Sequence, residues 1–216
     1  MSFSRFFANI QSFLPQKLLT NIVKKITRIK TPLIKNKLIK IFIKIYNVEL
    51  TDALEKDIST YENFNAFFTR KLTADSRPID EDHNIIVSPV DATIYHYGKI
   101  NQDQLLQAKG KHYSITALLN DDENKARPFY QGQAITFYLA PEDYHRYHMP
   151  CDGQLLDMVY VPGKLFSVNT HSVNKVNQLF CVNERVICYF QTQFGIMAMV
   201  LIGAFLVGSM HVNWLG

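Results

Sequence analysis

The chain has 216 residues, of which 47% are hydrophobic and 12% aromatic, so it can build a packed core and is not an intrinsically disordered chain. Its three cysteines are too few for a disulfide scaffold at this length, which favours a reducing, cytoplasmic setting. The net charge of +4 is unevenly spread: residues 1–47 carry ten basic side chains and no acidic one, leaving 13 basic against 19 acidic in the rest. A basic head of this kind is expected to meet an anionic partner, either lipid or nucleic acid.

Two helices are predicted within residues 1–47, with Pro32 between them, because apolar side chains recur every three or four positions. These positions are Leu18, Ile22, Ile26 and Ile29, then Leu38, Ile41, Phe42 and Ile45, with Lys37, Lys40 and Lys44 on another face. Short amphipathic helices with a lysine-rich face are typical of segments that lie in a membrane interface. The alternative is a helical hairpin packed on its own domain with a solvated basic face. The large apolar faces argue against nucleic-acid binding.

Residues 48–216 are expected to form a second, mainly β domain. No glycine precedes Gly98, and from about residue 85 short β-branched and aromatic runs alternate with turn residues. Helices are predicted over 63–72, capped by Asn63, and over a short segment that follows the cap Ser114. Strands are predicted over 93–97, 134–139, 155–161, 185–192 and 196–207. The fold class is therefore α+β: basic amphipathic N-terminal helices followed by a mainly antiparallel β domain.

The C-terminal stretch has no Asp, Glu, Lys or Arg after Arg185, and residues 196–207 are all apolar or glycine. One interpretation is a C-terminal membrane anchor. The unbroken apolar run is shorter than the roughly 20 residues that a spanning helix needs. A buried pair of strands is the preferred prediction.

His145 and His148 follow a predicted strand, and a loop after an apolar strand is a usual place for acid–base groups. With Cys151 they could instead ligate zinc. The segment lacks the glutamate of a zinc-protease helix and a second cysteine pair, so no metal is expected. A third interpretation makes both histidines hydrogen-bonding groups of a structural loop.

Asp91 and Ser209 complete the candidate set. An aspartate between apolar segments is costly to bury without a partner, and a histidine is a natural one; the alternative is a turn aspartate after Pro89. Ser209 follows Gly208 at the end of the last predicted strand, although a Gly-Ser pair alone is common in ordinary turns. An Asp–His–Ser set can activate a hydroxyl nucleophile.

A series of motifs from about residue 50 to the end resembles the ordered motifs of phosphatidylserine decarboxylases. The motifs are FFTRKL at 67–72, RPI at 77–79, SPVD at 88–91, DYHRYHMP at 143–150, VPGKLFSVN at 161–169, NERV at 183–186 and VGS at 207–209. The basic head is similar in kind to the membrane-binding start of bacterial members. A series in this order is far more specific than any one of the motifs.

The resemblance implies a lyase of phospholipid biosynthesis that converts phosphatidylserine to phosphatidylethanolamine without a metal. It implies a zymogen that cuts itself between Gly208 and Ser209, so that Ser209 becomes a pyruvoyl group. Asp91 and His148 are then the charge-relay partners of Ser209, and His145 assists decarboxylation.

The partners implied by the resemblance are phosphatidylserine in an anionic membrane and the chain's own cleaved C-terminal part, with a homodimer as an option and no nucleic acid. The implied location is peripheral, on the cytoplasmic face of the inner membrane. The chain departs from the family pattern at Ala92, where glycine is common, and it ends at Gly216, where members continue. The C-terminal part of the catalytic domain is therefore expected to be missing.

Two other functions stay open. A membrane-associated serine hydrolase could use the same Asp91, His148 and Ser209, although the chain has no Gly-x-Ser-x-Gly elbow around Ser209. A lipid-binding membrane adaptor without enzymatic activity could use the basic head and a short C-terminal anchor.

Overall fold

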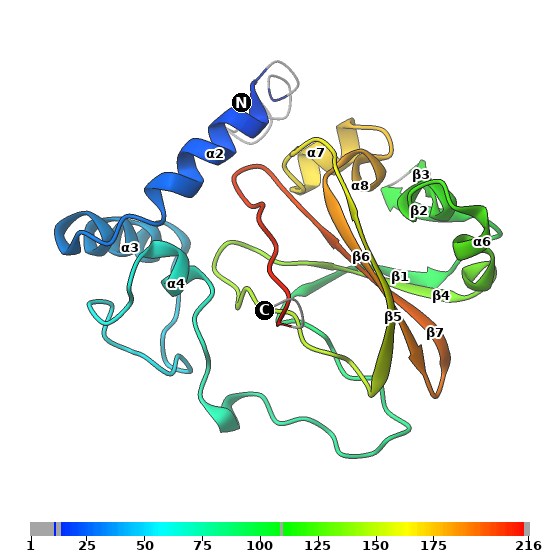
Figure 1. The fold of residues 1–216 in the computed structure, drawn as a ribbon, viewed down its shortest axis with the longest axis horizontal. Helices are drawn as coiled ribbons and strands as arrows, with labels where there is room; N and C mark the ends of the chain where they lie inside the picture. Colours follow the sequence, from blue (N-terminus) through cyan, green and yellow to red (C-terminus); the bar gives the residue numbers. More distant parts are fainter. Residues whose placement is uncertain (1–10, 12–13, 109, 214–216) are drawn as a thin grey trace. The chain divides into compact units, whose positions relative to one another are not determined.

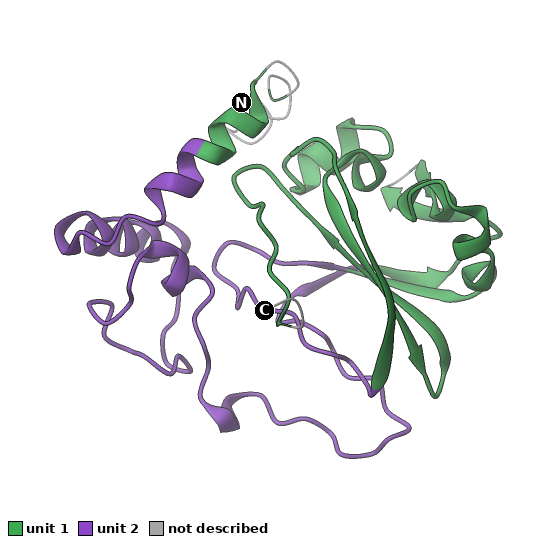
Figure 2. Cartoon of the chain, in the orientation of Figure 1, with its two compact units in different colours: residues 1–21, 96–136, 153–216 green, residues 22–95, 137–152 purple. Residues whose placement is uncertain are grey.

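The computed structural model describes residues 11, 14–108 and 110–213 (Figure 1). The chain forms two compact units (Figure 2): unit 1 holds residues 1–21, 96–136 and 153–216, and unit 2 holds residues 22–95 and 137–152. The chain passes from one unit to the other within helix α2 (Gln16–Ile26) and within strands β1 (Thr93–Lys99) and β4 (Gln133–Tyr138). Strands β1 and β4 pair as a two-stranded sheet.

Unit 1 is organised around an antiparallel sheet of β5 (Gly153–Val161), β6 (Arg185–Thr192) and β7 (Gly195–Ile202), with β6 in the middle (Figure 1). Every residue of β6 except Gln191 is buried, as the near-continuous apolar run of a central strand requires. A tight turn joins β6 to β7, where Thr192 pairs with Gly195. Gly195 has φ of 104°, a left-handed conformation that glycine adopts without a Cβ clash.

The other elements of unit 1 are short: strands β2 (Gln104–Ala108) and β3 (Lys111–Ser114), helices α5 (Ile115–Leu118), α6 (Glu123–Ala126), α7 (Thr170–Lys175) and α8 (Leu179–Val182), and the 3-10 turn η2 (Arg127–Phe129). Arg185 ties two of these helices to the sheet. Its buried guanidinium donates to carbonyls of Ala117 (2.8 Å) and Leu118 (2.7 Å) at the end of α5, and to Cys181 and Asn183 (3.1 Å) around the end of α8. A cation is favourable at the C-terminal ends of helices, where carbonyl groups point out of the helix.

The two segments 161–169 and 183–186 meet in unit 1. The Asn183 side chain donates to the carbonyls of Phe166 and Gly203, both at 2.9 Å, and Glu184 N–H donates to the Lys164 carbonyl at 2.8 Å. A Cβ added at Gly163 would lie 2.4 Å from the Glu184 nitrogen, so only glycine allows this approach of the two backbones. Part of the family-like motif series therefore consists of residues that hold the fold together.

Unit 2 contains helices α3 (Pro32–Tyr46) and α4 (Phe64–Phe68), the 3-10 turn η1 (Ala74–Ser76) and long loops. Its buried cluster consists of Ile39, Val48, Tyr61 and Phe67. Lys35 of α3 is also buried, and its ammonium donates to the carbonyls of Ser59 (2.7 Å) and Tyr61 (2.6 Å). Helix α3 is thus held within unit 2 by the buried side chain of Ile39 and by the two hydrogen bonds of Lys35.

The predicted α+β class and the antiparallel strands are confirmed. Strand 185–192 has the predicted bounds, and the strand pair predicted for the C-terminal stretch is formed by β6 and β7. The predicted burial holds for β6, whereas most residues of β7 are half-buried. The strand predicted over 196–207 ends at Ile202, because Ala204 and Val207 pair with each other in a turn. No helix within the described residues is long and apolar enough to cross a bilayer.

Two helix predictions needed adjustment. Pro32 is the first residue of α3 and does not lie between the helices, since proline suits a first helical turn that needs no N–H partner. The helix predicted over 63–72 ends at Phe68, although its cap is confirmed: Asn63 Oδ1 accepts the Ala66 N–H at 2.9 Å. Ser114 caps α5 in the same way, through the Ala117 N–H at 3.0 Å.

Candidate active site

His145 lies in the segment between β4 and β5, in unit 2. Its ring stacks on Phe68, with centroids 3.9 Å apart, and its Nε2 is 3.0 Å from the Ala140 carbonyl oxygen. Because a carbonyl oxygen only accepts, Nε2 must carry the proton in this hydrogen bond. Burial lowers the pKa of His145 to about 4, so the imidazole is neutral near pH 7. Its position and tautomer are therefore both fixed.

His148 has different surroundings in the same segment. Its side chain is exposed, and its Nε2 lies 3.0 Å from the Tyr144 hydroxyl. Its backbone N–H donates to the Pro89 carbonyl at 2.8 Å, and the Val87 N–H donates to the Pro150 carbonyl at 2.9 Å. These two bonds hold the His148 segment beside the segment that leads to Asp91.

The Asp91 carboxylate is bound by Arg77. Its Oδ2 accepts from Arg77 Nε at 2.7 Å and from Nη2 at 2.6 Å, while Arg77 Nη1 donates to Asp52 at 2.9 Å. The hydrogen bonds that Arg77 donates to Asp91 and to Asp52, in that order of size, raise the pKa of Arg77, which stays charged. In the described residues no hydrogen bond joins Asp91 to His148, so the two groups lie on neighbouring segments with other partners. Sequence reasoning did not assign a role to Arg77; its place in the RPI motif was the only signal.

Gly208 and Ser209 follow β7, in unit 1. Ser209 is exposed and has φ of 66°, a left-handed conformation that costs a serine of order 1–3 kcal/mol. A Cβ built on Gly208 would lie 3.6 Å from Glu184 Oε1, so the Glu184 carboxylate borders the Gly208–Ser209 turn. The Tyr160 hydroxyl donates to the other Glu184 oxygen at 3.1 Å. Glu184 was recognised only as part of a motif and was not predicted as a neighbour of this turn.

The four predicted residues are thus divided. Asp91, His145 and His148 belong to unit 2, and Ser209 belongs to unit 1. Within the described residues, no three His, Cys, Asp or Glu side chains form a group that could hold a metal ion. Unit 2 therefore offers three groups for acid–base chemistry. They are the fixed neutral imidazole of His145, the exposed imidazole of His148 and, on the adjoining segment, the carboxylate of Asp91.

The family model described as phosphatidylserine decarboxylase matches residues 64–214, and a second model, described as PSD, matches residues 6–47. The first match spans more than half of the chain and includes all four candidate residues. This chain belongs to the phosphatidylserine decarboxylase family. The resemblance predicted from the ordered motifs is therefore confirmed.

Similar proteins agree with this assignment. The chain is 46% identical over 207 residues to a phosphatidylserine decarboxylase proenzyme of Coxiella burnetii, covering 96% of this chain and 73% of that protein. It is 47% identical over 212 residues to the proenzyme of Ectopseudomonas mendocina, covering 98% of this chain and 74% of that protein. The proenzyme of Bordetella petrii is 46% identical over 202 residues, covering 94% of this chain and 70% of that protein. Between 26% and 30% of each of these relatives lies outside the matched region.

Proposed function

We propose that this chain is the proenzyme of a decarboxylase that converts phosphatidylserine to phosphatidylethanolamine and CO2 in phospholipid synthesis. The observation that carries the proposal is the family match over the segment that contains His145. That histidine is a half-buried, neutral acid–base group whose ring is held in place by a hydrogen bond. The relatives that support the substrate are named phosphatidylserine decarboxylase proenzymes.

The proposed cofactor is a pyruvoyl group made from the chain itself. Gly208–Ser209 fits as its source, since the serine is exposed and has a left-handed backbone conformation at the bond to be cut. Ser209 Oγ attacks the Gly208 carbonyl, so an ester replaces the amide; elimination then frees the Gly208 carboxylate and leaves dehydroalanine, which hydrolyses to ammonia and the pyruvoyl group. When formed, a pyruvoyl carbonyl supplies an electron sink for loss of CO2 from an amino acid.

The residues of unit 2 take separate roles in this proposal. His148, oriented by Asp91, accepts the proton of the attacking hydroxyl. For this the imidazole must give up its hydrogen bond to Tyr144, and the Asp91 carboxylate must bind His148 as well as Arg77. His145 delivers the proton that replaces CO2 on the product carbon. Its stacking on Phe68 and its bond to Ala140 keep the ring in place for that transfer.

Intact-mass spectrometry of the purified chain tests the cleavage. Cleavage should give two pieces with a carbonyl-bearing new N-terminus, and Ser209→Ala should abolish it. A Ser209→Ala chain that is still cut, or a parent chain that is never cut between 208 and 209, would contradict Ser209 as the source of the pyruvoyl group. His148→Ala should block cleavage, whereas His145→Ala should permit cleavage and lose CO2 release from phosphatidylserine.

The proposed location is the surface of an anionic membrane, with peripheral binding at its cytoplasmic face. Helix α3 exposes Leu33, Ile41 and Ile45 alongside its lysines, a combination that suits a lipid interface. All three cysteines are free, in keeping with a reducing compartment.

A further inference from the structure

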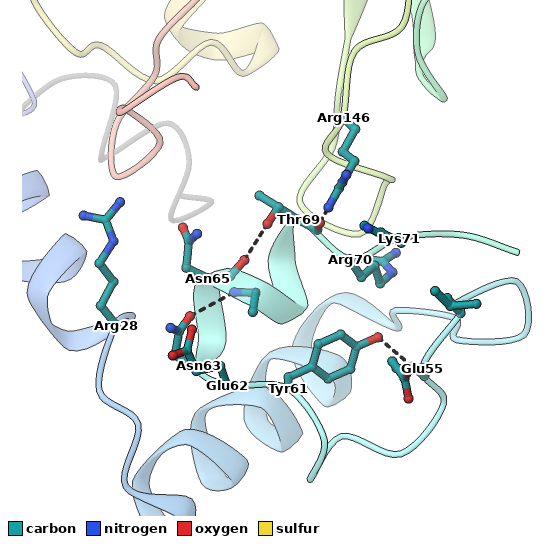
Figure 3. A pocket seen from close by; sticks show the side chains of 12 residues that line it. Arg28, Glu55, Tyr61, Glu62, Asn63, Asn65, Thr69, Arg70, Lys71 and Arg146 are labelled. Carbon is teal, nitrogen blue, oxygen red and sulfur yellow. Dashed lines mark hydrogen bonds between the residues drawn. The ribbon is translucent and has the colours of Figure 1, made fainter. Parts of the chain in front are cut away.

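An open pocket of about 590 Å³ lies within unit 2 (Figure 3). It is formed by the loop after α2, the segment around α4 and the segment that carries the two histidines. Its charged lining residues are Arg28, Glu55, Glu62, Arg70, Lys71 and Arg146. Four cations therefore face two carboxylates.

The positive charge of this pocket is not neutralised by the chain. Glu62 already pairs with Lys30, which does not line the pocket, at 2.5 Å. Among the described residues, none of the four lining cations has a carboxylate oxygen within 4.0 Å. An anion that enters the pocket would thus meet cations without competing ion pairs.

Arg70 is the strongest indication of a ligand. Its side chain is only 6% exposed, and one Nη2 hydrogen bond to the Glu142 carbonyl, at 3.2 Å, is its single hydrogen bond to a described residue. Its Nε is buried and has no hydrogen-bond partner. A buried cation without a carboxylate partner is costly, and burial lowers the pKa of Arg70 accordingly. An anion in the pocket would offset that cost.

Arg146 brings a second guanidinium to the pocket from a different segment. Its Nε donates to the Thr69 carbonyl at 2.9 Å, as Figure 3 shows, which ties Arg146 to the residue that precedes Arg70. Its two Nη groups make no hydrogen bond to any described residue, so their donors remain for a ligand. Arg146 lies between His145 and His148 in the chain, so its ligand would also restrain the histidine segment.

We propose that this pocket is a phosphate-binding site in which Arg70 and Arg146 hold one phosphate group; Arg28 lines a separate part of the pocket (Figure 3). Planar guanidinium groups bind phosphate oxygens through paired, charge-assisted hydrogen bonds, which a lysine-only surface does not provide. The volume falls within the range of about 300–1,000 Å³ of small-molecule pockets, so it admits a phosphate that carries a head group. The site requires no self-cleavage, and its test is therefore independent of the proposed function.

Isothermal titration calorimetry of the full chain, at constant salt, tests the site with two soluble probes: inorganic phosphate and glycerophosphoserine. Both should bind saturably. Arg146→Gln should weaken binding about tenfold, the loss of one charge-assisted hydrogen bond. Arg146 is half-buried, and circular dichroism verifies that its variant retains the fold. Lys56→Gln is the matched control, since it removes the same charge from an exposed side chain of unit 2 outside the pocket.

The probes also distinguish the two sources of the phosphate. Tighter binding of glycerophosphoserine, displaced by inorganic phosphate, indicates a lipid head group; equal affinities indicate free phosphate. Absence of saturable binding by both probes would overturn the proposal. An equal loss in Lys56→Gln would also overturn it, because the effect would then come from net charge and not from the pocket.

Discussion

His145 and His148 are three residues apart, yet the chain places them in opposite environments. His145 is enclosed by Phe68 and the Ala140 carbonyl, whereas His148 is exposed and contacts Tyr144. Their spacing in the sequence indicated only that both are acid–base groups of one loop. The difference between them arises from Phe68, which lies far away in the chain.

The pH dependence of stability should report the burial of His145. Its pKa is about 4 in the folded chain, against an ordinary value of 6.5. Between these values the unfolded chain binds more protons, so stability should fall as the pH falls from 6.5 to 4, by on the order of 3 kcal/mol. His145→Gln should remove this part of the slope in urea unfolding at pH 7, 6 and 5. Parallel curves for the variant and the parent chain would contradict the assignment.

Gly163 should be irreplaceable for packing. Alanine there would place its Cβ 2.4 Å from Glu184 N and 2.5 Å from the Asn183 carbonyl carbon, both backbone atoms that cannot move alone. Gly163→Ala should cost about 3 kcal/mol or more in the free energy of unfolding, measured by urea denaturation. Gly208→Ala is the matched control, because its nearest contact would be 3.6 Å. Equal stability of the two variants would show that the backbones can separate cheaply.

At the scale of elements, the apolar side chains of α3 have two roles: some are exposed and some pack in the core of unit 2. The apolar positions predicted a face for the membrane, and Ile41 and Ile45 are indeed exposed. Ile39 is fully buried in the cluster with Val48, Tyr61 and Phe67. Phe42, one of the predicted apolar positions, packs against this cluster. Part of the predicted apolar face therefore serves the core of unit 2, as the alternative of a packed helix required.

This division predicts unequal effects of two similar substitutions in α3. Ile39→Ala should lower the free energy of unfolding by about 2–5 kcal/mol, because it leaves a cavity in the core. Ile41→Ala should change it by less than about 1 kcal/mol, since Ile41 is 46% exposed. Thermal unfolding of both variants provides the comparison. A large loss in Ile41→Ala would show that this side chain also has a packing role.

At the scale of the whole molecule, membrane binding should depend on charge in the head. Removal of residues 1–47 would also remove Ile39 and Lys35 from the core, so point variants are the better test. The triple variant Lys37→Gln, Lys40→Gln, Lys44→Gln should bind vesicles of phosphatidylcholine and phosphatidylglycerol roughly a hundredfold more weakly, at about 1 kcal/mol per lysine. Added salt should reduce binding of the parent chain.

The control for that experiment removes the same charge elsewhere: Lys56→Gln, Lys99→Gln and Lys111→Gln. These lysines lie outside residues 1–47, so vesicle binding should stay close to that of the parent chain. An equal loss in both triple variants, in a sedimentation assay at fixed salt, would show that net charge and not the head governs binding.

Much of the fold could be predicted because its signals are local. The apolar run of 185–192 defined β6, and the short polar side chains of Asn63 and Ser114 marked helix starts through hydrogen bonds within three residues. The β2–β3 hairpin escaped prediction because its residues carry no clear alternation, and the buried Gln107 bonds instead to backbone carbonyls of Val173 and Val176. Hydrogen-bond partners so far away in the chain cannot be predicted from a local sequence pattern.

The sequence by itself determined the family, since an ordered series of motifs over most of the chain can be recognised without knowledge of the fold. It also identified Asp91, His145, His148 and Ser209 as candidates from residue type and position. Only the tertiary structure decided their partners: Arg77 for Asp91, Tyr144 for His148 and Phe68 for His145. The reason is physical. Residue type sets what a side chain can donate or accept, whereas burial and the segments packed beside it decide which groups it meets and how its pKa changes.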